Sequence, residues 1–263
     1  MMPSNLNETS AASNIKFGQN ANRLRLERHG FLTPCQLIAH RGLSGLAPEN
    51  SLAAIRLAAE AGYFGIEVDV HTTKDSHFVI FHDQTLNRMT GIEAHISEMI
   101  WDRLKDIRLA NGSNVKQYPD EKIPLLDEFL AICEPYGIVP VIEIKQVHSE
   151  DHLDRLVERL QAYRIFNQAI IISFHLNYLV YLRKGYPNLA MQLLVNEITP
   201  EVLEVCVQYG LDVDVNHSHL TAEQIQACHA QSLKVNVWTV DDLKRAQDLI
   251  DRGVDYITTN CLR

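Results

Sequence analysis

Histidines and carboxylates stand at the ends of short apolar runs in this sequence, and these residue types can carry acid/base and metal chemistry. His40 and Arg41 close the first run, and Gly42 after them lets the backbone turn tightly. In the second run, the alternation of a strand places Glu67 and Asp69 on one face and the aliphatic residues on the other. Two carboxylates are therefore expected to share one side of a strand.

A later apolar run repeats this arrangement, with Glu143 and Lys145 on one face. Inner barrel strands are buried on both faces, so carboxylates there need a cation or a partner. The alternative is that Glu143 pairs with Lys145, and Glu67 with Arg41, as structural ion pairs. Because all-oxygen ligation favours hard ions over zinc, we predict one divalent cation, Ca²⁺ or Mg²⁺, held by Glu67, Asp69 and Glu143.

A hairpin follows the second run. Residues 74–76 (Lys-Asp-Ser) give a turn signal, and a short strand at 78–82 follows too soon for a helical crossover. Residues at similar distances from a hairpin turn lie opposite one another. The hairpin is therefore expected to bring His82 beside Glu67 and Asp69.

The elements that must position these side chains alternate between apolar runs and helical patterns. The expected strands are residues 37–40, 66–70, 139–144, 170–174, 191–195, 213–216, 235–240 and 256–260. The expected helices are residues 51–61, 126–134, 151–163, 176–184, 200–209, 222–230 and 241–251. Eight strands with intervening helices predict an α/β fold, a TIM-type (β/α)8 barrel whose chemistry lies at the strand C-termini.

Two irregularities depart from a regular barrel. The hairpin after the second strand leads into a long insertion, about residues 84–124, with a helical stretch at 98–105. Three residues follow the last strand, so the usual eighth helix is missing, and a helix at residues 20–30 is expected to cover the gap. We therefore expect an N-terminal extension at 1–33, partly helical, and one barrel domain at 34–263.

Composition restricts the possible partners and compartments. A formal net charge of −9 argues against a nucleic-acid surface, which needs clustered Lys and Arg. The five cysteines are odd in number and lack CxxC spacing, which favours reduced thiols in a cytoplasmic protein. Neither a signal peptide nor an apolar run long enough to span a membrane is found. The oligomeric state stays open.

Short motifs in a fixed order resemble the glycerophosphodiester phosphodiesterase family over about residues 36–260. The resemblance rests on His40-Arg41-Gly42, Pro48-Glu49-Asn50-Ser51, Glu67-Val68-Asp69-Val70, Thr73-Lys74-Asp75, His82-Asp83, Leu86-Asn87-Arg88-Met89-Thr90-Gly91, Glu143-Ile144-Lys145 and Val237-Trp238-Thr239. Each tripeptide alone is weak, whereas their joint presence in order is specific. The resemblance implies a TIM-type barrel with an insertion after the His-Asp motif.

The resemblance also implies a role for each matching residue. His40 and His82 would be the general acid and base, Glu67, Asp69 and Glu143 the metal ligands, and Arg41 and Lys145 the phosphate-binding residues. The implied reaction is hydrolysis of a glycerophosphodiester to an alcohol and glycerol 3-phosphate, through a cyclic phosphate formed by the neighbouring glycerol hydroxyl. Ser51, Ser76 and Asn260 stand where the family usually has Thr, Gly and Asp. The change at Asn260 leaves the local hydrogen bonding open.

Several assignments keep two readings. Phe174 and Trp238 end inner strands and either form an apolar wall for the glycerol or pack in the core. We expect most other histidines to be solvated, namely His71, His95, His148, His175, His217 and His219, with His175 as a partial exception. Alternative functions are a related barrel phosphodiesterase for lysophospholipids or phosphoinositides, and a noncatalytic barrel that binds glycerophosphodiesters. Intact His40 and His82 argue against the second, because binding alone needs no acid and base.

Overall fold

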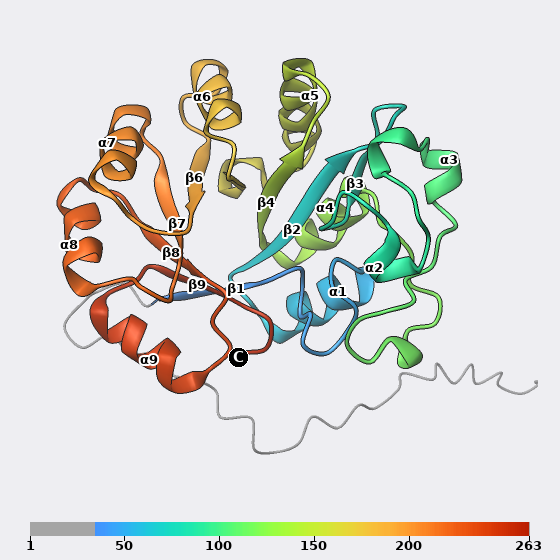
Figure 1. The fold of residues 1–263 in the computed structure, drawn as a ribbon, viewed down its shortest axis with the longest axis horizontal. Coiled ribbons are helices and arrows are strands. Elements are labelled where there is room, and N and C mark those ends of the chain that lie inside the picture. Colours follow the sequence, from blue (N-terminus) through green and yellow to red (C-terminus); the bar gives the residue numbers. More distant parts are fainter. Residues whose placement is uncertain (1–34, 263) are drawn as a thin grey trace, which may run out of the picture.

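Eight parallel strands close into a barrel in the computed structural model, which describes residues 35–262 (Figure 1). The strands are β1 (Gln36–Ala39), β2 (Gly65–Thr72), β4 (Val139–Gln146), β5 (Ile170–Ser173), β6 (Ala190–Val195), β7 (Asp212–Asn216), β8 (Val235–Trp238) and β9 (Tyr256–Thr259). Each pairs with the next in this order, and β1 pairs with both β2 and β9, which closes the ring. The predicted TIM-type barrel is confirmed.

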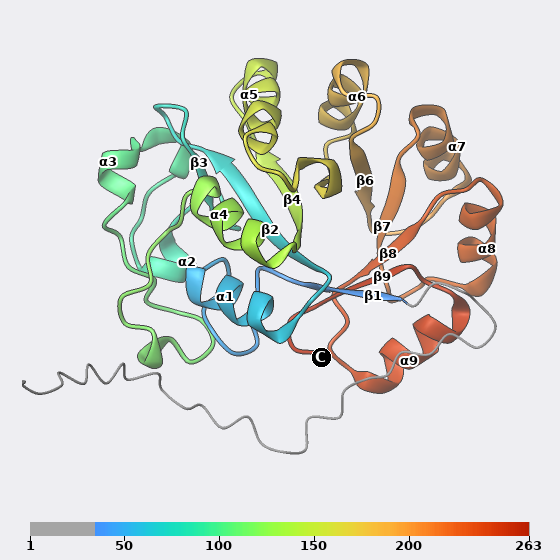
Figure 2. The same cartoon turned by 180° about the vertical axis from the view of Figure 1, so that it is seen from behind.

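Helices surround the outside of the strands (Figures 1 and 2). They are α1 (Leu52–Ala61), α4 (Leu126–Tyr136), α5 (Glu150–Gln161), α6 (Leu176–Gly185), α7 (Pro200–Tyr209), α8 (Ala222–Ala230) and α9 (Leu243–Arg252). α1 starts where the Ser51 side chain accepts a hydrogen bond from the backbone of Ala54, and it ends at Gly62 in the left-handed conformation. The helix predicted at residues 20–30 lies outside the described residues. Among the described helices, none is long and apolar enough to cross a membrane.

Strand alternation divides the apolar side chains between two layers. Ile66, Val68 and Val70 of β2 point outward and join the large cluster between strands and helices. A smaller cluster fills the barrel interior and includes Ile38 and Val141. The carboxylates of β2 therefore point into the barrel, on the same side of the strand as this inner cluster.

The predicted hairpin is present beside the barrel. β3 (Phe78–Ile80) pairs antiparallel with the end of β2, with Val70 opposite Ile80. The insertion that follows contains the short helices α2 (Asn87–Thr90) and α3 (Trp101–Leu104), which lie on the α1 side of the barrel in both views (Figures 1 and 2). Its apolar side chains form a separate small core with those of β3, namely Val79, Phe81, Leu86, Met89, Ile96, Leu104, Leu109 and Ile123.

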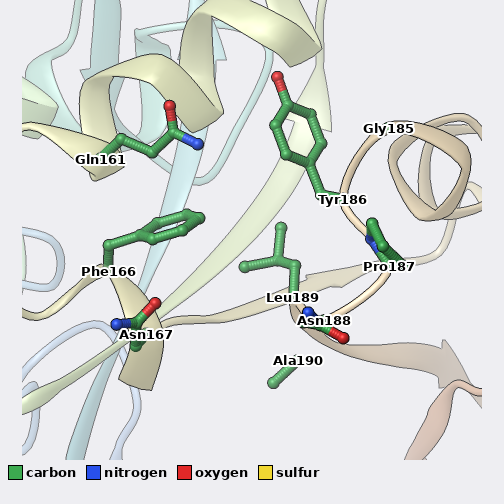
Figure 3. A pocket seen from close by; sticks show the side chains of 9 residues that line it. All are labelled: Gln161, Phe166, Asn167, Gly185, Tyr186, Pro187, Asn188, Leu189 and Ala190. Atoms are coloured by element: carbon green, nitrogen blue, oxygen red, sulfur yellow. The ribbon is translucent and has the colours of Figure 1, made fainter.

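A cavity of about 260 Å³ lies near the N-terminal ends of two strands and is lined by the segments just before β5 and β6 (Figure 3). Phe166, Tyr186 and Leu189 form its apolar part, and Gln161 and Asn167 contribute amides. None of its lining side chains carries a charge at neutral pH. It therefore lacks the acid, base and ligand groups that the sequence places at the strand C-termini.

Candidate active site

Three buried carboxylates meet where β2 and β4 approach their C-terminal ends. Asp69 and Glu143 lie side by side because the parallel register pairs them directly, and Glu67 lies two residues earlier on the same face of β2. One oxygen of each lies within 4.8 Å of the others. Among the described residues, Glu67 Oε1 is buried and has no hydrogen-bond donor. An oxygen-only cluster with an orphaned buried oxygen fits a hard divalent cation.

The pKa values of the three carboxyl groups show that it is electrostatically unfavourable to bring them together in their ionised forms. Burial, reinforced by Asp69 and Glu143, raises the pKa of Glu67 well above its ordinary value. Burial and the charge of Asp69 also raise the pKa of Glu143 to about 7. Burial opposes ionisation of Asp69 as well, but Arg41 and Lys145 outweigh it and hold the pKa of Asp69 below its usual range. A bound cation would let the whole cluster ionise.

Arg41 and Lys145 lie over the same carboxylates. Lys145 Nζ is 2.8 Å from Glu143 Oε1 and 3.3 Å from Asp69 Oδ1. Arg41 Nε is 3.2 Å from Asp69 Oδ2, while its backbone N–H donates to Glu67 Oε2 at 2.9 Å. Of the two ion pairs in the alternative to a cation site, that of Glu143 with Lys145 is present, whereas Glu67 contacts the backbone of Arg41 and not its guanidinium. Both cationic side chains keep 17–19% exposure, which leaves them accessible to an anion.

His40 follows β1 and lies at the edge of the carboxylate cluster. Its Nδ1 is 2.8 Å from Asn260 Oδ1, and its Nε2 is 4.0 Å from Glu67 Oε2. Burial, together with the charge of Arg41, lowers the pKa of His40 to about 4. The ring is therefore neutral at pH 7, with one nitrogen held by an amide and the other facing the cluster.

The hairpin brings His82 to the same cluster, as the sequence predicts. The backbone N–H of Phe81 donates to the carbonyl of Asp69 at 2.9 Å, which fixes the return strand next to β2. His82 Nδ1 lies 2.6 Å from Asp83 Oδ1. The ring is thus held from behind by a carboxylate, whereas His40 is held by an amide.

An ion-pair network behind the site includes residues to which the sequence analysis assigned no role. Arg88 of α2 binds both oxygens of Asp83, at 2.6 and 3.1 Å, and both oxygens of Glu49, at 2.7 and 3.1 Å. Glu49 also accepts a hydrogen bond from Arg41 Nη1 at 2.9 Å. One guanidinium therefore connects the carboxylate behind His82 with the one behind Arg41. Glu49, Asp83 and Arg88 all stand in the motifs that carry the family resemblance, and this was the signal in the sequence that could have identified them.

Two further buried residues support the site, and one of them corrects an expectation. Asn50 donates to Asp69 Oδ2 at 2.7 Å and accepts from the backbone N–H of Asp69 at 3.3 Å. The expectation that His71 is solvated is wrong, since it is 3% exposed and its Nε2 lies 3.1 Å from the carbonyl oxygen of His82. β2 continues to Thr72, beyond its predicted end, so His71 lies within the strand and under the hairpin.

A pocket of about 170 Å³ opens beside the cluster. Its lining residues are His71, His82, Gln84, Glu143, Ile144, Lys145, Phe174 and His175. Phe174 is 47% exposed and meets Trp238 edge to face, with ring centroids 5.8 Å apart. Phe174 therefore lines the pocket directly, and Trp238 braces it from behind.

A sequence model of the Glycerophosphoryl diester phosphodiesterase family matches residues 40–262. The matched range begins at His40 and includes the carboxylate cluster, the hairpin, the insertion and all of the strands after β1. Most of the described barrel is therefore covered by this one match.

Individual proteins similar to this chain point to the same family. The chain is 30% identical to the glycerophosphodiester phosphodiesterase of Caldanaerobacter subterraneus, over 85% of this chain and 93% of that protein. It is 28% identical to the glycerophosphodiester phosphodiesterase of Bacillus altitudinis, over 86% of this chain and 94% of that protein. Among solved structures, a phosphodiesterase from Oleispira antarctica in complex with the product sn-glycerol-3-phosphate has a TM-score of 0.81 and 29% identity, covering 86% of this chain and 93% of that one.

Proposed function

The chain belongs to the glycerophosphoryl diester phosphodiesterase family, and we propose that it hydrolyses glycerophosphodiesters to an alcohol and sn-glycerol 3-phosphate. The observation that carries this proposal is the meeting of His40 and His82 at one cluster of three buried carboxylates. The Oleispira antarctica structure, with its bound product, supports glycerol 3-phosphate as the product here. We also propose a cytoplasmic location, from the odd cysteine count and the lack of CxxC spacing.

Glu67, Asp69 and Glu143 would hold one divalent cation, Ca²⁺ or Mg²⁺, because they offer only oxygen ligands and Glu67 Oε1 is otherwise unpaired among the described residues. When bound, the cation supplies Lewis-acid stabilisation of charge on the phosphate and lowers the pKa of a coordinated hydroxyl. Arg41 and Lys145 bind the remaining phosphate oxygens from their partly exposed positions. These contacts strengthen as charge accumulates in the transition state.

The surroundings of the two histidines assign the proton transfers. His40 is neutral at pH 7 and has an amide behind it, so its free nitrogen acts as the general base toward the attacking hydroxyl. The carboxylate of Asp83 stabilises a positive charge on His82, so this ring delivers a proton to the departing alkoxide. Attack by the neighbouring glycerol hydroxyl would give a cyclic phosphate that water opens with the two roles exchanged.

Phe174 and Trp238 form the apolar wall against which the carbon chain of the glycerol lies. Since Phe174 is 47% exposed, its ring is available to a ligand without any rearrangement of the core. This contact would favour a glycerol over a bare phosphate and leaves the alcohol on the other side of the phosphorus unspecified.

The test measures release of glycerol 3-phosphate from glycerophosphocholine, glycerophosphoethanolamine and glycerophosphoinositol, and release of lysophosphatidic acid from lysophosphatidylcholine. We expect turnover that EDTA abolishes and that Ca²⁺ or Mg²⁺ restores, and His40→Ala and His82→Ala should each lower kcat about 10²–10⁴-fold. Release of lysophosphatidic acid from the lysolipid would assign the enzyme to the lysophospholipid class instead. Absence of turnover on every substrate by folded, cation-loaded protein would contradict the hydrolase proposal.

A further inference from the structure

Asp241, in the loop after β8, stands behind His40 without touching it. Asp241 Oδ2 accepts a hydrogen bond from Asn260 Nδ2 at 2.7 Å, and Asn260 Oδ1 lies 2.8 Å from His40 Nδ1. The other oxygen, Asp241 Oδ1, accepts from the Thr259 hydroxyl at 2.9 Å and from the backbone N–H of Asn260 at 2.8 Å. Hydrogen bonds thus lead from Asp241 to the ring of His40.

The carboxylate determines which way the Asn260 amide points. A carboxylate only accepts hydrogen bonds, so it requires the NH₂ group of Asn260 to face Asp241 and the amide oxygen to face His40. Ser44 does not decide the matter, because its hydroxyl lies 2.8 Å from Asn260 Oδ1 and 2.7 Å from the His40 carbonyl. It could donate to the amide oxygen or, with the amide reversed, accept from its NH₂ group. Asp241 is therefore the group that distinguishes the two orientations.

We propose that Asp241 is a positioning residue that acts through Asn260 to hold His40 in the Nδ1–H tautomer. An amide oxygen facing Nδ1 requires a proton there, which leaves the lone pair on Nε2, the nitrogen that faces the carboxylate cluster. This inference rests on the proposed role of His40 as a base, because only a bare Nε2 accepts a proton from the nucleophile.

The hydrogen bonds around Asp241 predict how Asp241→Asn changes the tautomer of His40. Thr259 and the Asn260 backbone both donate to the Oδ1 position, so the new amide keeps its oxygen there and turns its NH₂ group toward Asn260. Asn260 must then present its oxygen to that NH₂ group and its own NH₂ group to His40. Facing a donor, His40 Nδ1 loses its proton, and the ring changes to the Nε2–H tautomer.

The tautomer is measured by ¹⁵N NMR of histidine-labelled, cation-free full-length protein at about pH 7, where an unperturbed imidazole is largely neutral. The His40 signals are assigned by their loss in His40→Ala. We expect Nδ1–H in the natural sequence and Nε2–H in Asp241→Asn. The same tautomer in both proteins would overturn the proposal. Because this readout needs no turnover, an inactive protein with the expected tautomers would contradict the hydrolase function and leave the positioning role intact.

A double-mutant cycle measures the same relay through catalysis. Asp241→Asn reverses the amide and should lower kcat by about 10²-fold or more, as expected when a catalytic histidine is held in the wrong tautomer. Asn260→Asp should also lower kcat, because the carboxylates of residues 241 and 260 then face each other without a donor between them and displace the group that holds His40. The combined variant places a carboxylate behind His40 and an amide behind that carboxylate, which restores the Nδ1–H tautomer. We therefore expect kcat of the double variant to return to within about tenfold of the natural value, with KM little changed throughout.

Asp242→Asn is the matched control, because it makes the same change at the next residue, whose side chain accepts from the backbone of Arg245 at the start of α9. It should leave kcat within about twofold of the natural value. A double variant no more active than the weaker single variant, or equal losses in Asp242→Asn and Asp241→Asn, would contradict the proposal.

Discussion

At the scale of single residues, the site depends on groups that hold the reactive side chains as much as on those side chains themselves. Asp83 orients His82, Glu49 orients Arg41, and Arg88 binds both carboxylates. Arg88 is 42% exposed and lies outside the pocket. Its effect on catalysis must therefore pass through the residues that it positions.

Replacement of Arg88 tests this connection. Arg88→Met keeps most of the side-chain length and removes every donor, so we expect kcat to fall about 10–100-fold, as for residues that orient a catalytic group from behind. Lys105→Met is the control, since it breaks an exposed ion pair with Asp102 in the same insertion. It should leave both kcat and the free energy of unfolding close to their values in the natural protein, because an exposed ion pair contributes little. Steady-state kinetics of both variants decide the matter, and equal activities would contradict the positioning role.

The same substitution predicts a dependence of stability on pH. Burial raises the pKa values of Glu49 and Asp83, but hydrogen bonds from Arg88 outweigh it and hold both pKa values below their ordinary range. Carboxyl groups with lowered pKa values stabilise the folded state above their unfolded pKa and lose that contribution as the pH falls through the folded value. Urea unfolding should therefore separate Arg88→Met from the natural protein at neutral pH, and the gap should close below about pH 4. A gap that widens in acid would contradict this account.

At the scale of elements, the sequence predicted the barrel well because strands and helices alternate in hydrophobic period. The predicted ends of α7 and α8 agree with the structure, and the other barrel helices differ from the prediction by a few residues at their ends. The chemistry of the carboxylates was predictable for the same reason, since alternation put Glu67 and Asp69 on the inner face. These conclusions needed only local pattern.

Contacts between distant segments could not be predicted in this way. The bonds from Asp241 to Asn260 and from Arg88 to Glu49 join loops whose approach depends on the closed barrel and on the path of the insertion. The burial of His71 depended on a strand end two residues later than expected, and strand ends depend on pairing with neighbours as well as on local sequence. Local pattern therefore gave the candidate site residues and missed most of the residues that contact them.

The insertion packs against the segment that follows β1 in the candidate site. Gly112 has φ +110°, and a Cβ there would lie 2.9 Å from Pro48 Cα, next to Glu49. Asn114 also donates to the carbonyl of Leu46 at 3.0 Å. The loop of the insertion thus packs against the segment that carries Glu49 and Asn50.

Gly112→Ala should disturb this packing. Gly91→Ala is the matched control, because Gly91 also has a positive φ (+76°) but a Cβ there meets no atom within 4 Å. We expect Gly91→Ala to cost about 1 kcal/mol of unfolding free energy from backbone strain alone, and Gly112→Ala about 1–3 kcal/mol more from overpacking. Only Gly112→Ala should also lower kcat. Urea unfolding and steady-state kinetics measure the two quantities. Equal losses of unfolding free energy in the two variants would show that the loop moves aside without strain, which would contradict this prediction.

At the scale of the whole molecule, the barrel interior carries more polar groups than a packed parallel barrel usually does. Gln192, Asp214, Asn236 and Thr258 are buried on consecutive strands β6 to β9. Burial, together with the charge of Glu143, raises the pKa of Asp214 well above its ordinary value. The raised pKa favours the protonated form of Asp214, which limits further negative charge near the carboxylate cluster.

Stability of the whole barrel should therefore depend on the divalent cation. Saturation at about 100 times Kd adds about 2.7 kcal/mol to the free energy of unfolding, which corresponds to a rise of about 5–10 °C in Tm for a chain of this size. Glu67→Gln should abolish the rise in Tm with Ca²⁺ or Mg²⁺. In the cation-free protein the same substitution should not lower Tm, because it removes a carboxyl group whose ionisation is opposed by burial and by the charges of Asp69 and Glu143.

The pH dependence of this stabilisation follows from the raised pKa values of Glu67 and Glu143, about 7 for Glu143 against an ordinary 4.5. Groups with raised pKa values stabilise the folded state fully below the unfolded pKa, and that contribution is lost as the pH rises through the folded value. The cation-free protein should therefore lose stability as the pH rises from about 4.5 to about 7, where the cation-bound protein, whose ligands are already deprotonated, should lose less. Thermal unfolding with EDTA and with Ca²⁺ across this range should give a difference in Tm that grows with pH. A difference that is constant or shrinks would mean that protons and the cation do not compete for these carboxylates, and the assignment of the cluster as the cation site would fail.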